Sequence, residues 1–352
     1  MIIKLLFALL LLGFSIVLNN VLLRFSKTLG IRNHDLSIVR WSASSKPALG
    51  GISFFVIFLI SIASAGFLVQ THLYNARLLG VIGACCLGFI MGLADDAYNT
   101  RPLLKFLVQV SCALILIFTG TMISFFDTAW LNYLITIVWV VGIMNSVNML
   151  DNMDAVTTSV SIAILLGIVV LLIFNNNTDS VLFYVLLGNL AALVGFLFFN
   201  WYPSKMFMGD TGSQYLGALL AAVGIIFYWN ANDNTVAINN QWIRLVVPLL
   251  AFAVPIIDTT TVVVNRLLKK QSPFVGGKDH TTHHLFYIGL TERRIAILLF
   301  SISLASVAMI VWFLNNYELT INTFKYLAYI SFIFFFLLLY VPTVIVKRNN
   351  NK

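Results

Sequence analysis

The sequence predicts an all-α, polytopic membrane protein, and three observations support this fold class. Charged residues make up 10% of the 352 residues, against roughly 25% in soluble domains, while hydrophobic residues reach 60%. The mean hydropathy is +0.95. Apolar runs of about 18 residues or more, long enough to cross a bilayer, recur along the chain with few charges inside them. These runs leave no room for a separate soluble domain, so residues 1–352 are expected to form a single integral-membrane domain.

The apolar runs define the expected helices, about 10–11 of them transmembrane. The first run carries Lys4, as a signal peptide would, but it is longer than a signal-peptide core and lacks an A-x-A-like cleavage site, so we expect a helix. Cys85, Cys86 and Cys112 fall inside apolar runs and are expected to pack rather than form disulfides. In chain order, the expected helices cover residues 1–23, 48–69, 77–94, 103–120, 130–147, 155–174, 181–199, 212–229, 242–267, 294–314 and 323–346.

The basic residues predict how these helices cross the membrane. If the N-terminus faces outward, all but four of the 21 Lys and Arg residues lie on the inner side; the exceptions are Lys4, Arg77, Arg244 and Lys325. The formal net charge of +8 is therefore one-sided, which suits anionic lipid headgroups and anionic substrates. This pattern predicts a multi-pass membrane protein whose basic loops face the cytoplasm.

Five polar clusters fall at inner helix ends or inner loops under this topology. The expected outer loops hold acids and amides but neither histidine nor an acidic cluster, so the chemistry is expected at the cytoplasmic face. The clusters are KPALGG (46–51), GLADDAYNTRPLLKFLVQ (92–109), NSVNMLDNMDA (145–155), NWYPSKMFMGDTGSQYLG (200–217) and GGKDHTTHH (276–284).

The residue types in these clusters suit a polyanionic substrate. Their carboxylates are ligands that Mg²⁺ accepts together with substrate phosphates: Asp95, Asp96, Asp151, Asp154 and Asp210. Lys46, Lys105, Lys205 and Arg266 are candidate counter-charges for phosphate. The turn at 209–212 (GDTG), which opens a helix, is expected to offer free backbone N–H groups to an anion. The adjacent acids at 95 and 96 should repel unless a cation or a proton lies between them; a solvated helix end is the alternative.

Two spacings leave alternatives open. Asn145, Asn148, Asp151 and Asp154 recur every three residues, so they can face one site only at a helix end, in a 3₁₀ turn or in a broken helix; a polar connecting loop is the alternative. The three residues His280, His283 and His284 fit one helical face. Because neither cysteines nor an HExxH pattern accompany them, phosphate contact is favoured over zinc.

Two further residues stand out. Asp258 follows Pro248 and Pro255 and lies about two turns before Arg266, so it is either functional or satisfies a proline-broken backbone. Phe207, beside the glycine turn, is a candidate surface for stacking a base.

The motifs together resemble a known family. KP..GG, DD with a following P..K, NxxNxxDxxD, FMGDTGSxxLG and a late HxxHH loop occur in this order over about residues 46–294. The set is similar to the polyprenyl-phosphate N-acetylhexosamine-1-phosphate transferases, a superfamily that includes the muramoyl-pentapeptide transferase of peptidoglycan synthesis. FMGDTGSQYLG is the most specific of these motifs, and the DD pair is the weakest.

The resemblance implies an inner-membrane enzyme in which a lipid phosphate attacks the β-phosphorus of a UDP-sugar. The products are UMP and a lipid-linked diphosphosugar that starts a cell-envelope glycan. The implied cofactor is Mg²⁺, with Mn²⁺ as the alternative ion. The implied partners are a UDP-N-acetylhexosamine, undecaprenyl phosphate and the bilayer, without nucleic acid; a homodimer is left open.

The resemblance also implies roles for individual residues. Asp210 would be the principal metal ligand, with Asn148 and Asp151 beside it, and Asp95 and Asp96 would handle the polyprenyl phosphate or its proton. In the resemblance, Lys46 would hold phosphate, Phe207 and Asp154 would lie near uracil, and the three histidines would bind the sugar diphosphate. The expected substrate-binding set is Lys46, Lys105, Asn148, Asp154, Phe207, Arg266, His280, His283 and His284, in which Lys105 and Arg266 are included as phosphate counter-charges.

The chain departs from the family pattern at two places. The usual DGxDG is DNMDA at 151–155, and the Arg that usually follows the His pair is Leu285. The short loop DHTTHHLFYIGLTERR favours UDP-N-acetylglucosamine or a similar sugar, with UDP-muramoyl-pentapeptide as the alternative donor. A transporter would place its polar groups near the bilayer midplane, often in inverted repeats, and no repeat is evident here. A non-catalytic scaffold is the second rival, which the density of acids at one face disfavours.

Overall fold

The computed structural model describes residues 2–26, 46–69, 75–231, 241–272 and 277–350, without the side chains of 317–322 and 347–350. Within these residues the elements are helical, apart from an isolated β-bridge between Ala48 and Phe207. The elements are α1 (Ile2–Phe25), α2 (Gly50–Leu68), α3 (Ala76–Tyr98), α4 (Pro102–Phe118), α5 (Ala129–Leu150), α6 (Val156–Phe174), α7 (Val181–Asn200), α8 (Gly209–Gly224), the π-helical continuation η1 (Ile225–Trp229), α10 (Gln241–Ala251), α11 (Ala253–Leu268), α12 (Thr281–Tyr287), α13 (Glu292–Asn315) and α14 (Tyr317–Asn350).

The all-α polytopic class is confirmed. Nine of the described helical stretches are long and apolar enough to cross a membrane, and α10 with α11 adds a tenth if the bent pair is one span. The run at 103–120, expected as a membrane helix, forms the shorter α4 of 17 residues. The prediction of one domain over 1–352 covers segments outside the described residues and stays a prediction.

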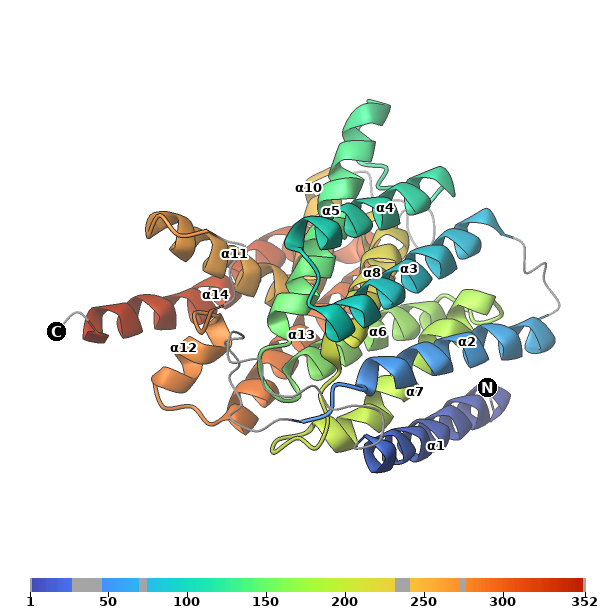
Figure 1. Cartoon of the computed structure of the whole chain (residues 1–352). Helices are drawn as coiled ribbons and strands as arrows, with labels where there is room; N and C mark the ends of the chain where they lie inside the picture. Colours follow the sequence, from blue (N-terminus) through green and yellow to red (C-terminus); the bar gives the residue numbers. More distant parts are fainter. Residues whose placement is uncertain (1, 27–45, 70–74, 232–240, 273–276, 351–352) are drawn as a thin grey trace.

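One expected helix is broken. The run at 242–267 was predicted to be continuous, but α10 and α11 meet at an angle of 83°. Pro255 explains the position of the break, because its ring clashes with the carbonyl four residues earlier, and α10 ends at that residue, Ala251. Figure 1 shows α11, α12 and the C-terminal end of α14 together on one side of the bundle, where α11 turns away from the other helices.

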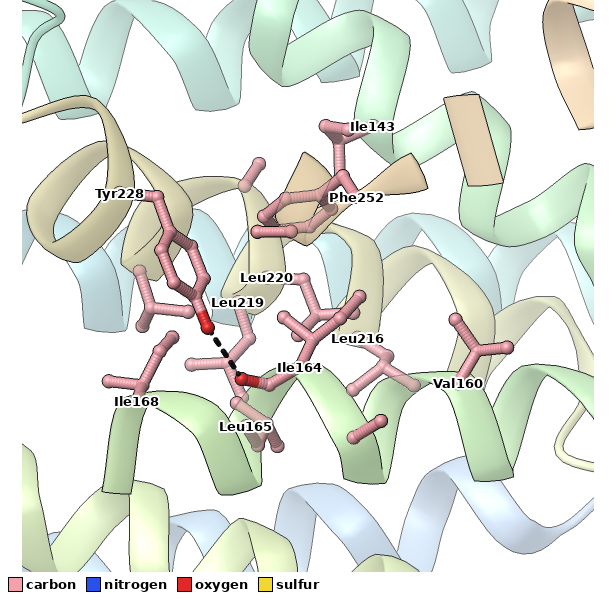
Figure 2. Close-up of a cluster of buried hydrophobic side chains, with 14 of the residues drawn as sticks. Ile143, Val160, Ile164, Leu165, Ile168, Leu216, Leu219, Leu220, Tyr228 and Phe252 are labelled. Carbon is pink, nitrogen blue, oxygen red and sulfur yellow. Dashed lines mark hydrogen bonds between the residues drawn. The ribbon is translucent and has the colours of Figure 1, made fainter. Parts of the chain in front are cut away.

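The centre of the bundle is formed by α6 and α8. Both are buried along almost their whole length, whereas α1 and residues 323–346 expose most of their apolar surface, as lipid-facing helices do. Figure 2 shows the core where α6, α8 and α5 meet, with Ile164, Leu216 and Phe252 in the cluster. The Tyr228 hydroxyl donates a 3.1 Å hydrogen bond to the Ile164 carbonyl, which satisfies the one polar atom of that ring.

Two glycines place the start of α8 against α3. Gly209 has φ +72°, a conformation that favours glycine, and it turns the chain into α8. On α3, Gly92 touches this turn so closely that a Cβ atom would overlap the Asp210 carbonyl oxygen and the Thr211 Cα. This approach brings the end of α3, with its two adjacent aspartates, beside the first turn of α8.

Candidate active site

The five polar clusters meet at one end of the bundle. The N-terminal segment of α2 pairs with the segment before α8: Phe207 N donates to Pro47 O at 3.0 Å, and Gly50 N donates to Phe207 O at 3.1 Å. The C-terminal ends of α3 and α5 and the N-terminal ends of α4 and α8 supply the remaining groups. Ion pairs and hydrogen bonds between side chains join these elements. Gly276 of the last cluster lies outside the described residues, as do four of the basic residues expected on the inner side: Lys27, Arg32, Arg40 and Lys352.

Lys105 bridges two of the predicted aspartates. Its Nζ lies 2.6 Å from Asp95 Oδ2 and 3.4 Å from Asp210 Oδ2. Asp95 is buried and also accepts hydrogen bonds from Thr100, from N at 2.9 Å and from Oγ1 at 2.5 Å. The ammonium therefore neutralises carboxylates from two helices at once, and it is half-buried beside the more accessible Asp210.

Asp96 points to different partners from its neighbour. It accepts from Asp210 N at 3.1 Å, from Thr211 N at 2.8 Å and from Thr211 Oγ1 at 2.6 Å. The glycine turn was expected to offer its N–H groups to a substrate anion, but the N–H groups of Asp210 and Thr211 are already bonded to Asp96. The N–H groups in the first turn of a helix have no acceptor inside that helix. Here the carboxylate of Asp96 is their acceptor. The charges of the adjacent acids are compensated separately, by Lys105 and by α8.

Asn148 lies against Asp210. Its Nδ2 donates to Asp210 Oδ1 at 2.5 Å and to Ser213 Oγ at 2.8 Å. The helix-end alternative for the NxxNxxDxxD spacing is confirmed, because α5 ends at Leu150 and the chain turns at 151–155. Asn145 does not share this site; it lies one turn deeper.

Three amide side chains, those of Gln109, Asn145 and Gln214, form hydrogen bonds one helical turn away from the site residues. Gln109 Nε2 donates to Gln214 Oε1 at 3.2 Å, and Asn145 Nδ2 donates to Gln109 Oε1 at 2.8 Å. Each amide lies one helical turn from a residue of the site: Gln109 from Lys105, Asn145 from Asn148, and Gln214 from Asp210. Sequence reasoning missed Gln109 and Gln214; their spacing of four from Lys105 and Asp210 was the available signal.

A second cluster contains Asp154, Lys46 and Phe207. Asp154 accepts from Ser204 N and Ser204 Oγ, both at 2.8 Å, and its Oδ2 lies 3.4 Å from Lys46 Nζ. Lys46 Nζ also lies 5.0 Å from the centroid of the Phe207 ring. The predicted phosphate and uracil residues are thus brought together, with Ser204 as a member that the sequence did not single out. Lys46 is already paired, so a phosphate would share its charge with Asp154.

The structure also shows how the chain compensates at position 155 for one of the two glycines that the DNMDA segment lacks. Ala155 has φ +63°, in the region where glycine is strain-free and alanine is not. The conformation is held by a hydrogen bond from Ala155 N to Asn200 Oδ1 at 3.1 Å, and Thr158 Oγ1 reaches the same oxygen at 2.7 Å. The turn that glycine would provide is therefore kept with alanine.

Asp151 is the acid with the least compensation. It follows the last residue of α5 and is half-buried. Desolvation raises its pKa well above the usual range, and the negative charges of Asp210, Asp96 and Asp154 raise it further. A cation near Asp151 and Asp210 would relieve this repulsion.

The donor set fits a magnesium ion shared with substrate. Within the described part of the chain, no three His, Cys, Asp or Glu side chains are grouped closely enough to hold a metal ion by themselves. Mg²⁺ is usually held by one or two carboxylates together with substrate phosphates, not by an all-protein cage. The residues Asp210, Asn148 and Asp151 match that requirement.

The three histidines do not lie on one helical face as predicted. His280 is the extended residue before α12, and only His283 and His284 are inside that helix. His280 N donates to His283 Nδ1 at 3.4 Å. Desolvation lowers the pKa of His283 to about 3 and lowers that of His284, so at neutral pH both rings are neutral. They can meet a phosphate as N–H donors rather than as cations.

Arg266 is not a free counter-charge. Its guanidinium makes two bonds to Asp279, Nε to Oδ2 at 2.8 Å and Nη2 to Oδ1 at 2.6 Å, and the side chain is buried. The neighbouring Arg266 lowers the pKa of Asp279, although burial opposes this. The pair ties α11 to the histidine segment. A phosphate contact by Arg266 would therefore have to compete with a formed bidentate pair.

The histidine segment reaches the acidic cluster through one hydrogen bond. Thr282 Oγ1 donates to Asn152 Oδ1 at 2.6 Å, and Asn152 follows Asp151 directly. Asp258 holds the same segment from α11, because its carboxylate binds His280 and Thr281. The alternative that Asp258 satisfies the backbone at the proline break is therefore not what these hydrogen bonds show. All five predicted clusters are thus connected by contacts.

Comparison with known proteins agrees with this geometry. Residues 78–228 match glycosyl transferase family 4. The "Probable undecaprenyl-phosphate N-acetylglucosaminyl 1-phosphate transferase" of Bacillus subtilis (strain 168) is 28% identical over 266 residues, covering 73% of this chain and 70% of the relative. The "Decaprenyl-phosphate N-acetylglucosaminephosphotransferase" of Mycobacterium leprae is 27% identical, covering 72% and 70%. The "Phospho-N-acetylmuramoyl-pentapeptide-transferase" of Limosilactobacillus fermentum is 27% identical, covering 71% and 77%.

A bundle of apolar helices with acids, lysines and histidines collected at one end defines a multi-pass membrane protein, and the collected polar groups are its candidate active site. Residues 78–228 of the chain match glycosyl transferase family 4. The chain is similar to the polyprenyl-phosphate N-acetylglucosamine-1-phosphate transferases, so the resemblance predicted from the motifs is confirmed.

Proposed function

We propose that this protein transfers N-acetylhexosamine-1-phosphate, with N-acetylglucosamine as the first candidate sugar, from a UDP-sugar to undecaprenyl phosphate. UMP is released, and the lipid-linked product starts a cell-envelope glycan at the cytoplasmic face of the inner membrane. The observation that carries the proposal is the Lys105 bridge between Asp95 and Asp210, at the end of the bundle where the polar clusters meet. A lipid phosphate and a nucleotide diphosphate could meet there beside a half-buried cation.

The chemistry exchanges one phosphoanhydride for another, so it needs charge neutralisation and in-line positioning more than a strong base. The second pKa of a phosphate monoester is about 6, so the lipid phosphate is largely dianionic at neutral pH. Asp95 holds Lys105 in place by the 2.6 Å ion pair, and Lys105 can then hold a phosphate at the mouth of the site. Asp95 and Asp96 thus act on the lipid phosphate mainly through Lys105 and α8.

Magnesium is part of the proposal. Asp210, Asn148 and Asp151 would hold the ion, which when bound would neutralise charge on the phosphate oxygens. Asp210 is prepared for this role by two contacts, from Asn148 Nδ2 and from Lys105, that fix the direction of its carboxylate. Mn²⁺ is the alternative ion, since its oxygen-ligand preference is similar.

The nucleotide is assigned to the second cluster. Phe207 is partly exposed and offers a ring face to uracil, and Lys46 beside it offers a positive charge to the adjoining phosphates. Asp154 is anchored by both bonds from Ser204, so its position is set before substrate binds. The histidine segment, joined to Asn152, would meet the sugar diphosphate.

The donor sugar is the least constrained part of the proposal. Only residues 288–291 separate α12 from α13, which leaves little chain to contact a peptide on the sugar. The relatives named for N-acetylglucosamine transfer support the same choice. The muramoyl-pentapeptide donor stays the alternative, because relatives named for that reaction match at similar identity.

The test is transfer from labelled UDP-sugars into organic-extractable lipid by purified protein with undecaprenyl phosphate and Mg²⁺. We expect product and UMP with UDP-N-acetylglucosamine or a close N-acetylhexosamine, and none with UDP-muramoyl-pentapeptide. Turnover with the pentapeptide donor alone would move the protein to the other branch. A transporter would move a UDP-sugar into vesicles without releasing UMP.

A further inference from the structure

Helices α11 and α12 are joined by one buried carboxylate, that of Asp258. Its side chain is fully buried, and it lies on α11 about two turns before Arg266. The chain leaves α11 after Leu268 and returns at residues 280 and 281, where both residues bind Asp258. A buried carboxylate is costly unless it is fully hydrogen-bonded, so these bonds are needed by the fold.

Each oxygen of Asp258 has its own task. Oδ1 accepts from Thr281 N at 2.8 Å and from Thr281 Oγ1 at 2.5 Å, which closes the start of α12. Oδ2 lies 2.9 Å from His280 Nδ1. The first oxygen therefore has a structural role at a helix end, while the second binds the side chain of a residue already assigned to the site.

The bond to Oδ2 determines which nitrogen His280 presents. An ionised carboxylate can only accept, so Nδ1 must carry a proton. Nε2 is then the nitrogen turned to a ligand, and it donates to an anion when the ring is protonated at both nitrogens. The ring orientation is further limited by His283, whose ring lies 5.5 Å away at 75° and whose Nδ1 accepts from His280 N. His280 is buried and therefore has few other orientations available.

The same short segment is anchored to the acidic site. Thr282, two residues after His280, donates from Oγ1 to Asn152 Oδ1. Asn152 follows Asp151 directly. The segment is therefore fixed on one side by Asp258 of α11 and on the other by the turn that follows α5. A change at Asp258 would be transmitted to His280 at the edge of the acidic cluster.

We propose that Asp258 is a positioning residue for the transfer reaction: it holds the Nδ1–H of a doubly protonated His280, so that Nε2–H donates to the diphosphate of the bound UDP-sugar. The inference deepens the proposed function and rests on it. Its competitor is a purely structural role, in which Asp258 only closes α12 and the orientation of His280 is incidental. The two oxygens with separate partners allow these roles to be tested separately.

The experiment compares four variants of the full-length enzyme: Asp258→Asn, His280→Asn, the two combined, and Thr281→Val as the matched control for the helix-closing bond. Kinetic constants for UMP release and thermal unfolding in detergent are measured for each. Loss of a carboxylate that orients a histidine typically lowers function on the order of 10–100-fold. We expect Asp258→Asn to lower kcat in that range with a smaller change in KM.

His280→Asn tests the contact of Nε2 with the substrate apart from the bond to Asp258. The Asn side chain keeps a polar group near the position of Nδ1 but has no group at the position of Nε2. We expect it to unfold close to the wild-type temperature and to lose activity on the order of 10–100-fold. The double variant should be no less active than His280→Asn alone, since residues acting as one unit are non-additive. Thr281→Val should retain activity within about threefold.

Three results would overturn the inference: wild-type kcat in Asp258→Asn, losses that multiply in the double variant, or a fully active His280→Asn. If Asp258→Asn does not fold, Asp258→Glu replaces it, because it keeps the charge but displaces the carboxylate. A positioning role predicts a lower kcat in this folded variant, and a purely structural role predicts the wild-type kcat. Failure of the proposed function has a different signature, namely no UMP release by the wild-type enzyme with any UDP-N-acetylhexosamine.

Discussion

Asp96 closes the first turn of the helix that carries Asp210: its carboxylate accepts the Asp210 N–H at 3.1 Å and the Thr211 N–H at 2.8 Å. The Asp210 side chain is thereby presented from a helix end whose own polar groups are already satisfied. Its neighbour Asp95 instead binds Lys105. Two adjacent acids thus set the backbone and the counter-charge of one site, and each can be tested separately.

Replacing Asp96 tests the helix-closing role. Asp96→Ala removes three hydrogen bonds to the first turn of α8, and losing such a cap typically costs about 0.5–2 kcal/mol. We expect a lower unfolding temperature together with reduced turnover, because Asp210 shifts with its backbone. Thermal unfolding and UMP release are the measurements. An Asp96→Ala variant that is inactive yet as stable as the wild type would assign Asp96 to the chemistry instead.

Replacing Asp210 tests the centre of the site. Asp210→Asn keeps the shape of the side chain but removes the charge, so turnover should fall by at least ~10³-fold while the protein stays folded. Asp179→Asn is the matched control, because Asp179 pairs with Lys4 away from this cluster and is exposed. It should have wild-type activity. Magnesium-dependent turnover by Asp210→Asn at near the wild-type rate would contradict the assignment.

Two glycine-to-alanine changes test the contact between α3 and α8. Gly92→Ala places a methyl group against the backbone of Asp210 and Thr211, and overpacking of this kind typically costs about 1–3 kcal/mol. Gly142→Ala on α5 meets no atom within 4 Å and should be neutral or stabilising. Unfolding temperature and activity should fall in the first variant only. Equal effects in both would show that the close approach at Gly92 is unimportant.

The buried His283 predicts a pH dependence of stability. Desolvation lowers its pKa from 6.5 to about 3, so between these values the unfolded chain binds a proton that the folded chain does not. Its contribution to stability is therefore complete above pH 6.5 and is lost as pH falls toward 3. His283→Asn, which keeps an acceptor for His280 N, should lose less stability than the wild type over pH 6.5–4.5. Parallel curves of unfolding temperature against pH would contradict this.

The predicted orientation can be measured with single cysteines in a background lacking the three native ones. Asn177→Cys lies in the turn between α6 and α7, and Lys269→Cys follows α11. A membrane-impermeant thiol reagent should label position 177 in intact cells and position 269 only after permeabilisation. Labelling of position 269 from outside would place the site on the other face of the membrane.

Several features followed from the sequence because they depend on local composition or spacing. The length of the apolar runs predicted the helices, since a bilayer demands about 20 apolar residues whatever the tertiary partners. The ordered motifs predicted the family. The spacing in NSVNMLDNMDA included a helix end among its alternatives, and α5 ends at Leu150. The side of the membrane, the magnesium ion and a homodimer remain predictions.

The partners of the polar residues were decided only by the tertiary structure. Asp96 and Thr211 are 115 residues apart in the sequence, and Lys105 and Asp210 are 105 apart. Arg266 was expected to bind phosphate, but in the structure it forms an ion pair with Asp279. Asp258 could be noticed in the sequence but not interpreted, because the groups that bind it lie 22 and 23 residues further along the chain. Helix formation is set by hydrogen bonds four residues apart, whereas pairing of buried charges depends on which helix ends the packing brings together.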